Sequence, residues 1–391
     1  MASPHEQAEY LLRNAVEALP AGELERQLAR ARPLRVKLGI DPTAPDIHLG
    51  HTVVLEKLRE FQDFGHTVVL IIGDYTARVG DPSGRSAMRP VLSGEEIDHN
   101  AETYQRQAFK ILDPERTEVR RNGEWLDMPA EDLFRLTRHA TVAQLLARED
   151  FANRWKAQQP ISVLELLYPL LQGFDSVAIK ADVELGGTDQ HFNLLLGREI
   201  QQAYGVEPQS ILTMPILPGT DGVARMSKSS GNYIGVDEPP EEIFGKVMSI
   251  PDDAMPLYYS LLTHERFDRD EHPNQAKRRL ARILVDRFHG DGAGEAAEQH
   301  FDRLFKQREA PEEMPEFPLP AGDSVHLPAL LREAFGVSGA EARRLLAGGG
   351  VRVNGDALGG DELDLEADRL RGAILQLGRR RFVRLVDGSV G

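Results

Sequence analysis

The chain has 391 residues, 41% hydrophobic and 28% charged, which predicts a globular protein of two or three domains. It contains no cysteine, which excludes disulfides and thiolate metal sites, and neither a signal peptide nor a membrane span is expected, so we predict a cytoplasmic protein. Its net charge of −16 argues against a generic polyanion-binding protein, because nucleic-acid binding depends on lysine and arginine meeting phosphate.

The N-terminal part predicts a doubly wound α/β domain with a parallel, Rossmann-like sheet over residues 1–238. Helices are expected at residues 4–18 and 22–31. Apolar and β-branched runs predict strands, and the amphipathic segments between them predict helices. The expected strands are Arg35–Ile40, Thr67–Gly73, Val177–Leu185 and Ser210–Leu217, and the helices are Gly50–Phe64 and Phe192–Tyr204. Ligands of such a sheet bind at the carboxyl ends of its strands.

The rest of the chain divides by composition. Residues 90–150 are expected to be a helical insertion, with a short polar turn near Arg121–Gly123. Residues 239–308 predict an α-helical domain without strands. Glu309–Ser324 holds four prolines and four glutamates and is expected to be a semi-rigid linker. Residues 325–391 predict a small α+β domain.

A histidine pair begins the helix near residue 50. His48 and His51 are three apart, so they share one face of the first turn, where unpaired backbone N–H groups suit a phosphate. Gly50 lies between them and lets a ligand approach the backbone. Such a pair is also found on ordinary surfaces or as half of a zinc site, although zinc needs further ligands.

A second motif, Arg225-Met226-Ser227-Lys228-Ser229, lies in a glycine-rich and polar stretch over residues 219–232. This composition predicts a surface loop that can change conformation. The flexible ammonium of Lys228 can neutralise phosphate charge, and the serines add hydroxyl donors. An ordinary solvated loop would have a similar composition.

These two motifs resemble the signatures of class I aminoacyl-tRNA synthetases, and the chain resembles the bacterial tyrosyl-tRNA synthetases over nearly its whole length. The resemblance implies that His48 and His51 stabilise the α-phosphate of ATP, while Lys228, with Arg225 and Ser229, acts on the leaving pyrophosphate. Arg225 stands where the family usually has lysine. The resemblance also implies a nucleotide side, formed by Asp41, Thr43, His48, Gly50, His51, Gly187, Asp189, Met226 and Lys228.

The same resemblance implies a tyrosine side. Tyr168, Gln172 and Asp175 share one face of a predicted helix. In the family, the residues that match Tyr168, Gln172 and Asp81 bind the α-amino group of tyrosine. The aspartate that matches Asp175 accepts a hydrogen bond from the phenol of tyrosine. Gly39 and Gln190 are implied as further tyrosine contacts. Turn and cap roles remain the alternative for the aspartates at 41, 81 and 189 and for Thr43.

Lys37 departs from the best-known bacterial members, which have tyrosine at this position, and resembles a second bacterial branch that has lysine. A buried ammonium here would pair with Asp175 at the floor of the pocket or reach elsewhere.

The C-terminal string SGAEARRLLAGGGVRVNG predicts a helix capped by Ser338, ended by Gly348–Gly350 and followed by a strand and tight turn at Val351–Gly355. It resembles the S4 RNA-binding domain, which implies that Arg343, Arg344 and Arg352 face phosphates. Residues 369–384 carry six arginines and no carboxylate, which adds Arg379, Arg380 and Arg381 as RNA-binding candidates. A structural domain with solvated arginines is the alternative.

The resemblance implies an enzyme that joins L-tyrosine and ATP into tyrosyl-adenylate, releases pyrophosphate, and transfers tyrosine to the 3′ end of tRNA(Tyr). Mg²⁺ is expected with the triphosphate, without a tightly bound cofactor or a protein metal site, and the enzyme is expected to be a homodimer that binds no membrane. Residues 239–308 then lie on the anticodon side. Two alternatives stay open. A tryptophan-specific synthetase is disfavoured by Asp175, Gln190 and the S4-like end, and a noncatalytic RNA-binding derivative of the fold would be free to lose His48, His51 or Lys228.

Overall fold

The computed structural model describes residues 2–43, 46–82, 93–305, 314–320, 322–358, 363–378 and 381–387. It divides into two compact units, Met1–Gly294 and Glu295–Gly391. The part of the chain that is described contains no helix long and apolar enough to cross a bilayer.

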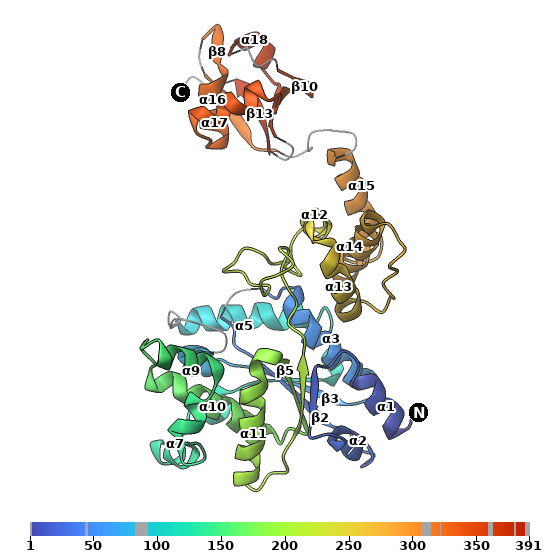
Figure 1. Cartoon of the computed structure of the whole chain (residues 1–391), viewed down its shortest axis with the longest axis vertical. Coiled ribbons are helices and arrows are strands. Elements are labelled where there is room, and N and C mark those ends of the chain that lie inside the picture. The colour runs from blue at the N-terminus through green and yellow to red at the C-terminus, as the bar shows by residue number, and fades with distance from the viewer. Residues whose placement is uncertain are drawn as a thin grey trace. The chain divides into compact units, whose positions relative to one another are not determined.

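A twisted sheet with helices on both faces forms the N-terminal unit, so the prediction of a doubly wound α/β fold is confirmed (Figure 1). Its strands are β1 (Glu17–Leu19), β2 (Arg35–Ile40), β3 (Thr67–Ile72), β4 (Thr117–Arg121), β5 (Val183–Gly187) and β6 (Ser210–Met214). Its longer helices are α1 (Pro4–Leu11), α3 (Leu49–Asp63), α5 (Gly94–Ala108), α7 (Ala130–Thr137), α9 (Glu149–Lys156), α10 (Val163–Ile179) and α11 (His191–Ala203). The shorter ones are α2 (Glu23–Leu28), α4 (Thr76–Val79), α6 (Gly123–Leu126) and α8 (Val142–Leu146).

The strand order, β1-β6-β5-β2-β3-β4, places a topological switch point between β2 and β5. All neighbours are parallel except β1, which runs antiparallel to β6. Strand β2 pairs with β3 from Arg35 to Ile40, whereas its register with β5 comprises Val36↔Val183 and Lys37↔Glu184. Beyond Lys37 the two strands therefore separate, and their carboxyl ends leave room for a ligand.

Three predictions within this unit are wrong. The expected helical insertion at 90–150 contains β4, an edge strand whose sequence TEVRR lacks an apolar pattern. The expected helix at 4–18 ends at Leu11 and is followed by β1. The expected strand Val177–Leu185 is the end of α10, a left-handed cap at Lys180, and then β5.

Close packing of α10 against α11 depends on two glycines. A Cβ built on Gly173 would lie 2.6 Å from Ile200 Cδ1 and 3.2 Å from Gly197 Cα. No larger side chain fits between the helices without moving them. This packing holds the face of α10 that carries Tyr168, Gln172 and Asp175 toward the sheet.

The N-terminal unit ends in helices, as predicted for the region after residue 239. They are α12 (Pro240–Ser249), α13 (Met255–Leu262) and α14 (Pro273–His289), and α15 (Ala293–Phe305) follows them (Figure 1). Tyr258 and Tyr259 are fully buried on α13, and each donates its hydroxyl to a backbone carbonyl.

The C-terminal unit is a small α+β domain with its own apolar core. Its main sheet has the order β10-β9-β12-β13-β7, and β8 pairs with β11. The strands are β7 (Glu316–Leu319), β8 (Ser324–His326), β9 (Val351–Val353), β10 (Asp356–Ala357), β11 (Asp364–Glu366), β12 (Ile374–Leu377) and β13 (Arg381–Asp387), and the helices are α16 (Leu327–Phe335), α17 (Gly339–Ala347) and α18 (Ala367–Leu370).

Two local predictions in this unit are confirmed and one is wrong. Ser338 caps α17 by accepting the N–H of Glu341, and Asn354 and Gly355 both have positive φ in the turn after β9. The prediction of a linker over residues 309–324 is wrong at Glu316–Leu319, because this segment is strand β7, which pairs in parallel with β13. Residues 306–313 and 321 lie outside the described residues.

Candidate active site

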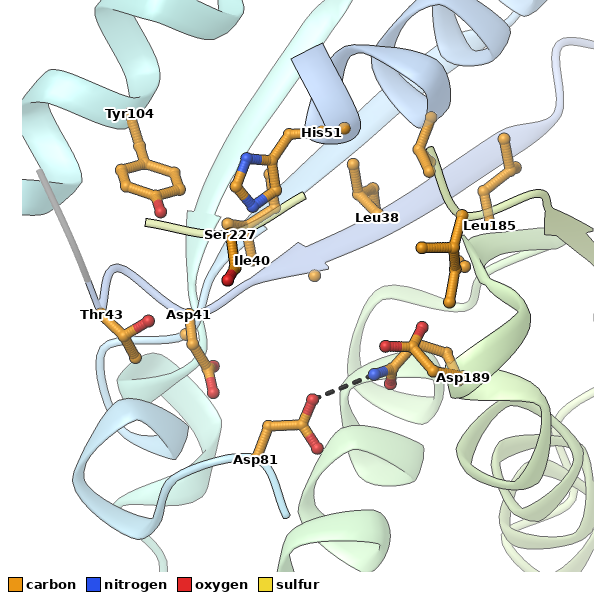
Figure 2. Close-up of a pocket in the computed structure, with 18 of the residues that line it drawn as sticks. Leu38, Ile40, Asp41, Thr43, His51, Asp81, Tyr104, Leu185, Asp189 and Ser227 are labelled. Carbon is orange, nitrogen blue, oxygen red and sulfur yellow. Dashed lines mark hydrogen bonds between the residues drawn. The ribbon is translucent and has the colours of Figure 1, made fainter. Parts of the chain in front are cut away.

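A cavity of about 530 Å³ opens at the carboxyl ends of β2 and β5, at the switch point of the sheet. Every residue predicted for the nucleotide, tyrosine and catalytic roles lines it, with the exception of Lys37. The predicted residues that line it are Gly39, Asp41, Thr43, His48, Gly50, His51, Asp81, Tyr168, Gln172, Asp175, Gly187, Asp189, Gln190, Arg225, Met226, Lys228 and Ser229. Figure 2 shows His51 and Ser227 on one side of this cavity and Asp81 and Asp189 on another.

Backbone pairing brings the two motifs together, although about 175 residues separate them in the chain. His48 forms an antiparallel bridge with Gly235, and the N–H of Leu49 bonds to Ile234 O at 2.9 Å. The segment that follows the lysine motif therefore runs beside the histidine motif. Met226 is buried against the backbone there, 3.6 Å from the position that a Cβ on Gly50 would occupy.

The two imidazoles are neutral and aligned as donors. His48 Nδ1 accepts the N–H of Gly50, and His51 Nδ1 accepts the N–H of His48, each at 3.2 Å. Since Nδ1 is an acceptor in both rings, the proton of each neutral ring lies on Nε2. Burial, aided by the charges of Arg225 and Lys228, lowers the pKa of His48 to about 2 and that of His51 to about 4.

The cations of the second motif are held by carboxylates around the cavity. Lys228 Nζ donates to Asp46 at 2.7 Å, and Arg225 donates to Asp189 at 2.6 Å. Burial raises the pKa of Asp189, and Arg225 opposes that rise. Asp46 also lines the cavity, and no local sequence pattern marks its role.

Asn232 organises the loop that carries the lysine. Its side chain is buried, donates to Asp221 at 2.8 Å and to Arg225 O at 3.2 Å, and accepts the N–H of Ser227 at 2.9 Å. A Cβ on Gly219 would lie 2.3 Å from Asn232, so the turn depends on glycine there. The surface loop predicted over 219–232 is thus internally bonded, with Met226 buried.

On the tyrosine side, the hydroxyl of Tyr168 donates to Asp41 at 2.9 Å, and Asp41 also accepts from Thr76 at 2.7 Å. Asp175 accepts from the indole of Trp125 at 2.8 Å and more weakly from Asn122 at 3.4 Å. Burial raises the pKa of Asp175 to about 7, against the opposing effect of the nearby Lys37 ammonium. Trp125 and Asn122 were missed because they lie in the region predicted as an insertion.

Asn193 links the side chains predicted to contact tyrosine. Its amide donates to Gln172 and to Gln190 at 3.0 Å each, and Gln190 donates to Asp81 at 3.0 Å. The bond to Asp81 is the dashed line in Figure 2. Arg148 donates to the Asn193 oxygen at 2.9 Å. Asn193 and Arg148 are buried and carry no motif, so only the tertiary structure identifies them.

Lys37 does not line the cavity. Its ammonium is fully buried and lies 2.9 Å from Glu184. Of the two arrangements predicted from the sequence, a pair with Asp175 or a contact elsewhere, the structure therefore has the second. Glu184 was not predicted.

The predicted RNA-binding arginines fall into three groups. Arg343 and Arg344 are exposed on α17. Arg352 is half-buried and donates to Gly355 O, whereas Arg381 is exposed, donates to Phe335 O and lies over the Phe335 ring. Arg379 and Arg380 lie outside the described residues.

The chain is similar to known proteins of one family. The family described as tRNA synthetases class I (W and Y) matches residues 29–306. The chain is 50% identical to the tyrosine–tRNA ligase of Thermotoga maritima in an alignment of 399 positions that covers 99% of both chains. It is 51% identical to that of Bordetella pertussis over 389 residues, 95% of this chain and 94% of the relative. The crystal structure of a tyrosyl-tRNA synthetase complexed with L-tyrosine, from Archaeoglobus fulgidus, has the same fold, with a TM-score of 0.64, 24% identity, and coverage of 76% of this chain and 99% of that one.

Proposed function

Because the chain belongs to the class I tRNA synthetases, and within them to the tyrosine–tRNA ligases, we propose that its cavity holds ATP and L-tyrosine side by side. The family activates tyrosine and charges tRNA with it. One observation carries the assignment to this cavity: the histidine pair, the lysine motif and the polar face of α10 all line it.

Activation is an in-line substitution at phosphorus. A carboxylate oxygen of tyrosine forms a bond to the α-phosphorus of ATP, the bond from that phosphorus to the bridging oxygen breaks, and pyrophosphate leaves. A ribose hydroxyl at the 3′ end of tRNA(Tyr) then attacks the acyl carbon and AMP leaves. No protein nucleophile is needed, so catalysis consists of orientation and charge stabilisation.

The imidazoles stabilise charge that develops on the α-phosphate. Each presents an Nε2–H, because each Nδ1 already accepts a backbone N–H. They remain neutral because of their lowered pKa values, so they act as hydrogen-bond donors fixed at a helix N-terminus, where an anion is favoured.

Lys228 acts on the β- and γ-phosphates. In the structure its ammonium is paired with Asp46, and we expect it to exchange that carboxylate for phosphate oxygens when ATP binds. Arg225 and Ser229 assist at the same end, while Asp41, Thr43, Gly50, Gly187, Asp189 and Met226 line the nucleoside side.

Mg²⁺ accompanies the triphosphate in this proposal. The described residues include no cluster of three or more candidate ligands, so phosphate oxygens and water supply most of the coordination. The Asp46 carboxylate, once released by Lys228, is an oxygen ligand of the kind that Mg²⁺ prefers, and the bound ion would neutralise phosphate charge.

Tyrosine is selected by hydrogen bonds in a buried pocket. Asp175 accepts from the phenol, and Tyr168, Gln172 and Asp81 hold the α-amino group. A site built to bond a hydroxyl discriminates against a substrate without one, because its polar groups are then left unpaired. Gly39 leaves space here, since a Cβ on it would meet no atom within 4 Å.

The whole enzyme is proposed to be a cytoplasmic homodimer. Large apolar side chains are exposed around α7, α9 and the start of α10, including Phe134 at 65%, Trp155 at 66% and Val163 at 75%. Exposed apolar side chains that form a contiguous patch mark a protein interface, and we place the dimer contact at these helices. Sedimentation of Val163→Asp tests this: a monomer is expected, and an unchanged dimer would contradict the assigned surface.

The reaction itself is tested by amino-acid-dependent exchange of pyrophosphate into ATP. Exchange with tyrosine, and not with tryptophan or phenylalanine, is expected. Exchange driven by tryptophan would make the enzyme its tryptophan-specific relative, and no exchange with any amino acid would leave a noncatalytic RNA-binding protein.

A further inference from the structure

Lys37 and Glu184 face each other directly across β2 and β5, at the fork where these strands separate. The residues that follow them, Leu38–Ile40 and Leu185–Gly187, line the cavity. Both side chains are almost wholly buried, with exposures of 0% and 2%. The ion pair is therefore placed immediately behind the cavity.

All three protons of the Lys37 ammonium are used within the protein. It donates to Gln172 O and to Ser176 Oγ at 2.8 Å each, and it pairs with Glu184 at 2.9 Å. No donor remains for a substrate hydroxyl. Lys37 is thus not a direct ligand of tyrosine in this arrangement.

Glu184 bonds to the same turn of α10. It accepts from the Gln172 amide at 3.3 Å, from Ser176 Oγ at 3.1 Å and from the Gln209 side chain. Gly197 makes room for these groups, because a Cβ there would lie 3.1 Å from Gln209 and 3.4 Å from Glu184.

The two positions of α10 that the ion pair contacts, Gln172 and Ser176, lie on either side of Asp175, in the turn that the proposed function assigns to tyrosine binding. Gln172 is itself one of the groups assigned to tyrosine. Fixing the backbone at 172 and the side chain at 176 therefore fixes the height and orientation of that turn above the sheet.

Stability alone does not account for such a pair. Replacing a buried ion pair by apolar residues of similar volume is often neutral or stabilising, because desolvation offsets the attraction of the charges. What the pair does provide is a fixed position for the turn of α10 that it contacts.

We propose that the Lys37–Glu184 pair is a positioning element that sets the tyrosine specificity of the enzyme by holding the Gln172–Ser176 turn of α10 at the floor of the pocket. The inference rests on the proposed assignment of the tyrosine site. It adds two positioning residues that do not touch the substrate.

The test replaces both partners, as Lys37→Met with Glu184→Gln, so that no unpaired charge is buried. Steady-state pyrophosphate exchange on the full-length protein should show a KM for tyrosine raised by about 10- to 100-fold, since small misplacement of a binding group can cost about 10²-fold. The KM for ATP should stay unchanged, and the ratio of kcat/KM for tyrosine over phenylalanine should fall.

A matched control is Lys57→Met with Glu60→Gln, which removes another buried lysine pair of the same unit, on α3 and away from the cavity. It should change the melting temperature without changing the KM for tyrosine. Equal losses for tyrosine, phenylalanine and ATP in the Lys37–Glu184 variant would mean a merely structural role and overturn the proposal, as would unaltered tyrosine kinetics.

If the double variant does not fold, Ser176→Ala decides, because it removes one Lys37 contact without burying a charge. A raised KM for tyrosine alone supports the proposal, and wild-type kinetics overturn it. Asp175→Asn distinguishes a failure of the positioning role from a failure of the proposed tyrosine pocket. If Asp175→Asn keeps the full preference for tyrosine over phenylalanine, the tyrosine pocket itself is refuted. If Asp175→Asn loses this preference but the Lys37–Glu184 variants keep wild-type kinetics, only the positioning role is refuted.

Discussion

Asp175, the proposed hydrogen-bond acceptor for the tyrosine phenol, is a buried carboxyl group whose charged form destabilises the fold. Burial raises its pKa to about 7, although the Lys37 ammonium and the bonds from Trp125 and Asn122 favour the charged form. An ordinary aspartate titrates near 4 in the unfolded chain, so the folded protein binds more protons between these values. This contribution to stability is present below pH 4 and is lost as the pH rises through 7.

Asp175→Asn should therefore stabilise the protein at pH 8 and impair tyrosine recognition. Each pKa unit corresponds to about 1.4 kcal/mol, so the gain in unfolding free energy is at most about 4 kcal/mol. Urea unfolding at pH 8 and pH 4.5 measures it, and the difference between the proteins should shrink at the lower pH. A variant that is less stable at pH 8 would show that the buried carboxylate does not destabilise the fold.

Lys228→Ala removes the cation that we propose stabilises the negative charge developing on the leaving pyrophosphate in the transition state. Adenylate formation should slow by about 10²–10³-fold, the usual cost of losing one such donor. The KM for tyrosine should change little, since Lys228 lies on the phosphate side. Single-turnover formation of tyrosyl-adenylate at several tyrosine concentrations measures both the rate and the dependence on tyrosine. A near-normal rate would contradict the proposed role of Lys228.

Secondary structure was predictable where local pattern and burial agree. Strand β3 is an apolar run, and in β2 the apolar residues Val36, Leu38 and Ile40 alternate with others; both strands occur at the expected residues. Strand β4 is charged and lies at the edge of the sheet, so no periodicity marks it. The end of α10 and the start of β5 are both largely apolar, and only the short segment Lys180–Asp182, which begins with a left-handed residue, separates them. Among site residues, the short motifs were predictable, whereas Asp46, Glu184 and Asn193 acquire roles only through packing between distant segments.

The loop over residues 219–232 behaves as one element because Asn232 bonds to several of its parts. Asn232→Ala should raise the KM for ATP and lower kcat, with little effect on the KM for tyrosine. Loss of a buried hydrogen-bonding partner costs about 1–3 kcal/mol, which corresponds to a rate loss of roughly 5- to 160-fold if the whole cost appears in the rate. Val223→Ala, at a side chain 87% exposed in the same loop, is the control and should be silent. Equal behaviour of the two variants would show that the loop does not position Lys228.

For the whole molecule, we expect the N-terminal unit, whose residues line the cavity, to form the adenylate and the C-terminal unit to bind RNA. A net charge of −16 opposes RNA binding unless positive charge is concentrated locally. The described part of the C-terminal unit exposes Arg343 and Arg344 on α17 and Arg381 on β13, and the last of these also contacts Phe335. These three arginines are the exposed candidates for the RNA surface proposed from the sequence.

Arg343→Ala combined with Arg344→Ala should weaken tRNA charging and leave pyrophosphate exchange intact. The slope of the salt dependence of tRNA binding should decrease by about one for each phosphate that an arginine no longer neutralises. Arg381→Ala is the contrasting variant, because it should lower the melting temperature of the C-terminal unit. Unimpaired charging by the double variant would mean that these arginines are merely solvated.

The most direct measurement is a crystal structure of the full-length enzyme with L-tyrosine and a non-hydrolysable ATP analogue. The Nε2 atoms of His48 and His51 should lie within hydrogen-bonding distance of the α-phosphate, and Lys228 Nζ should have left Asp46 for the β- or γ-phosphate. A nucleotide bound elsewhere, or a lysine still paired with Asp46 beside a bound triphosphate, would contradict the account.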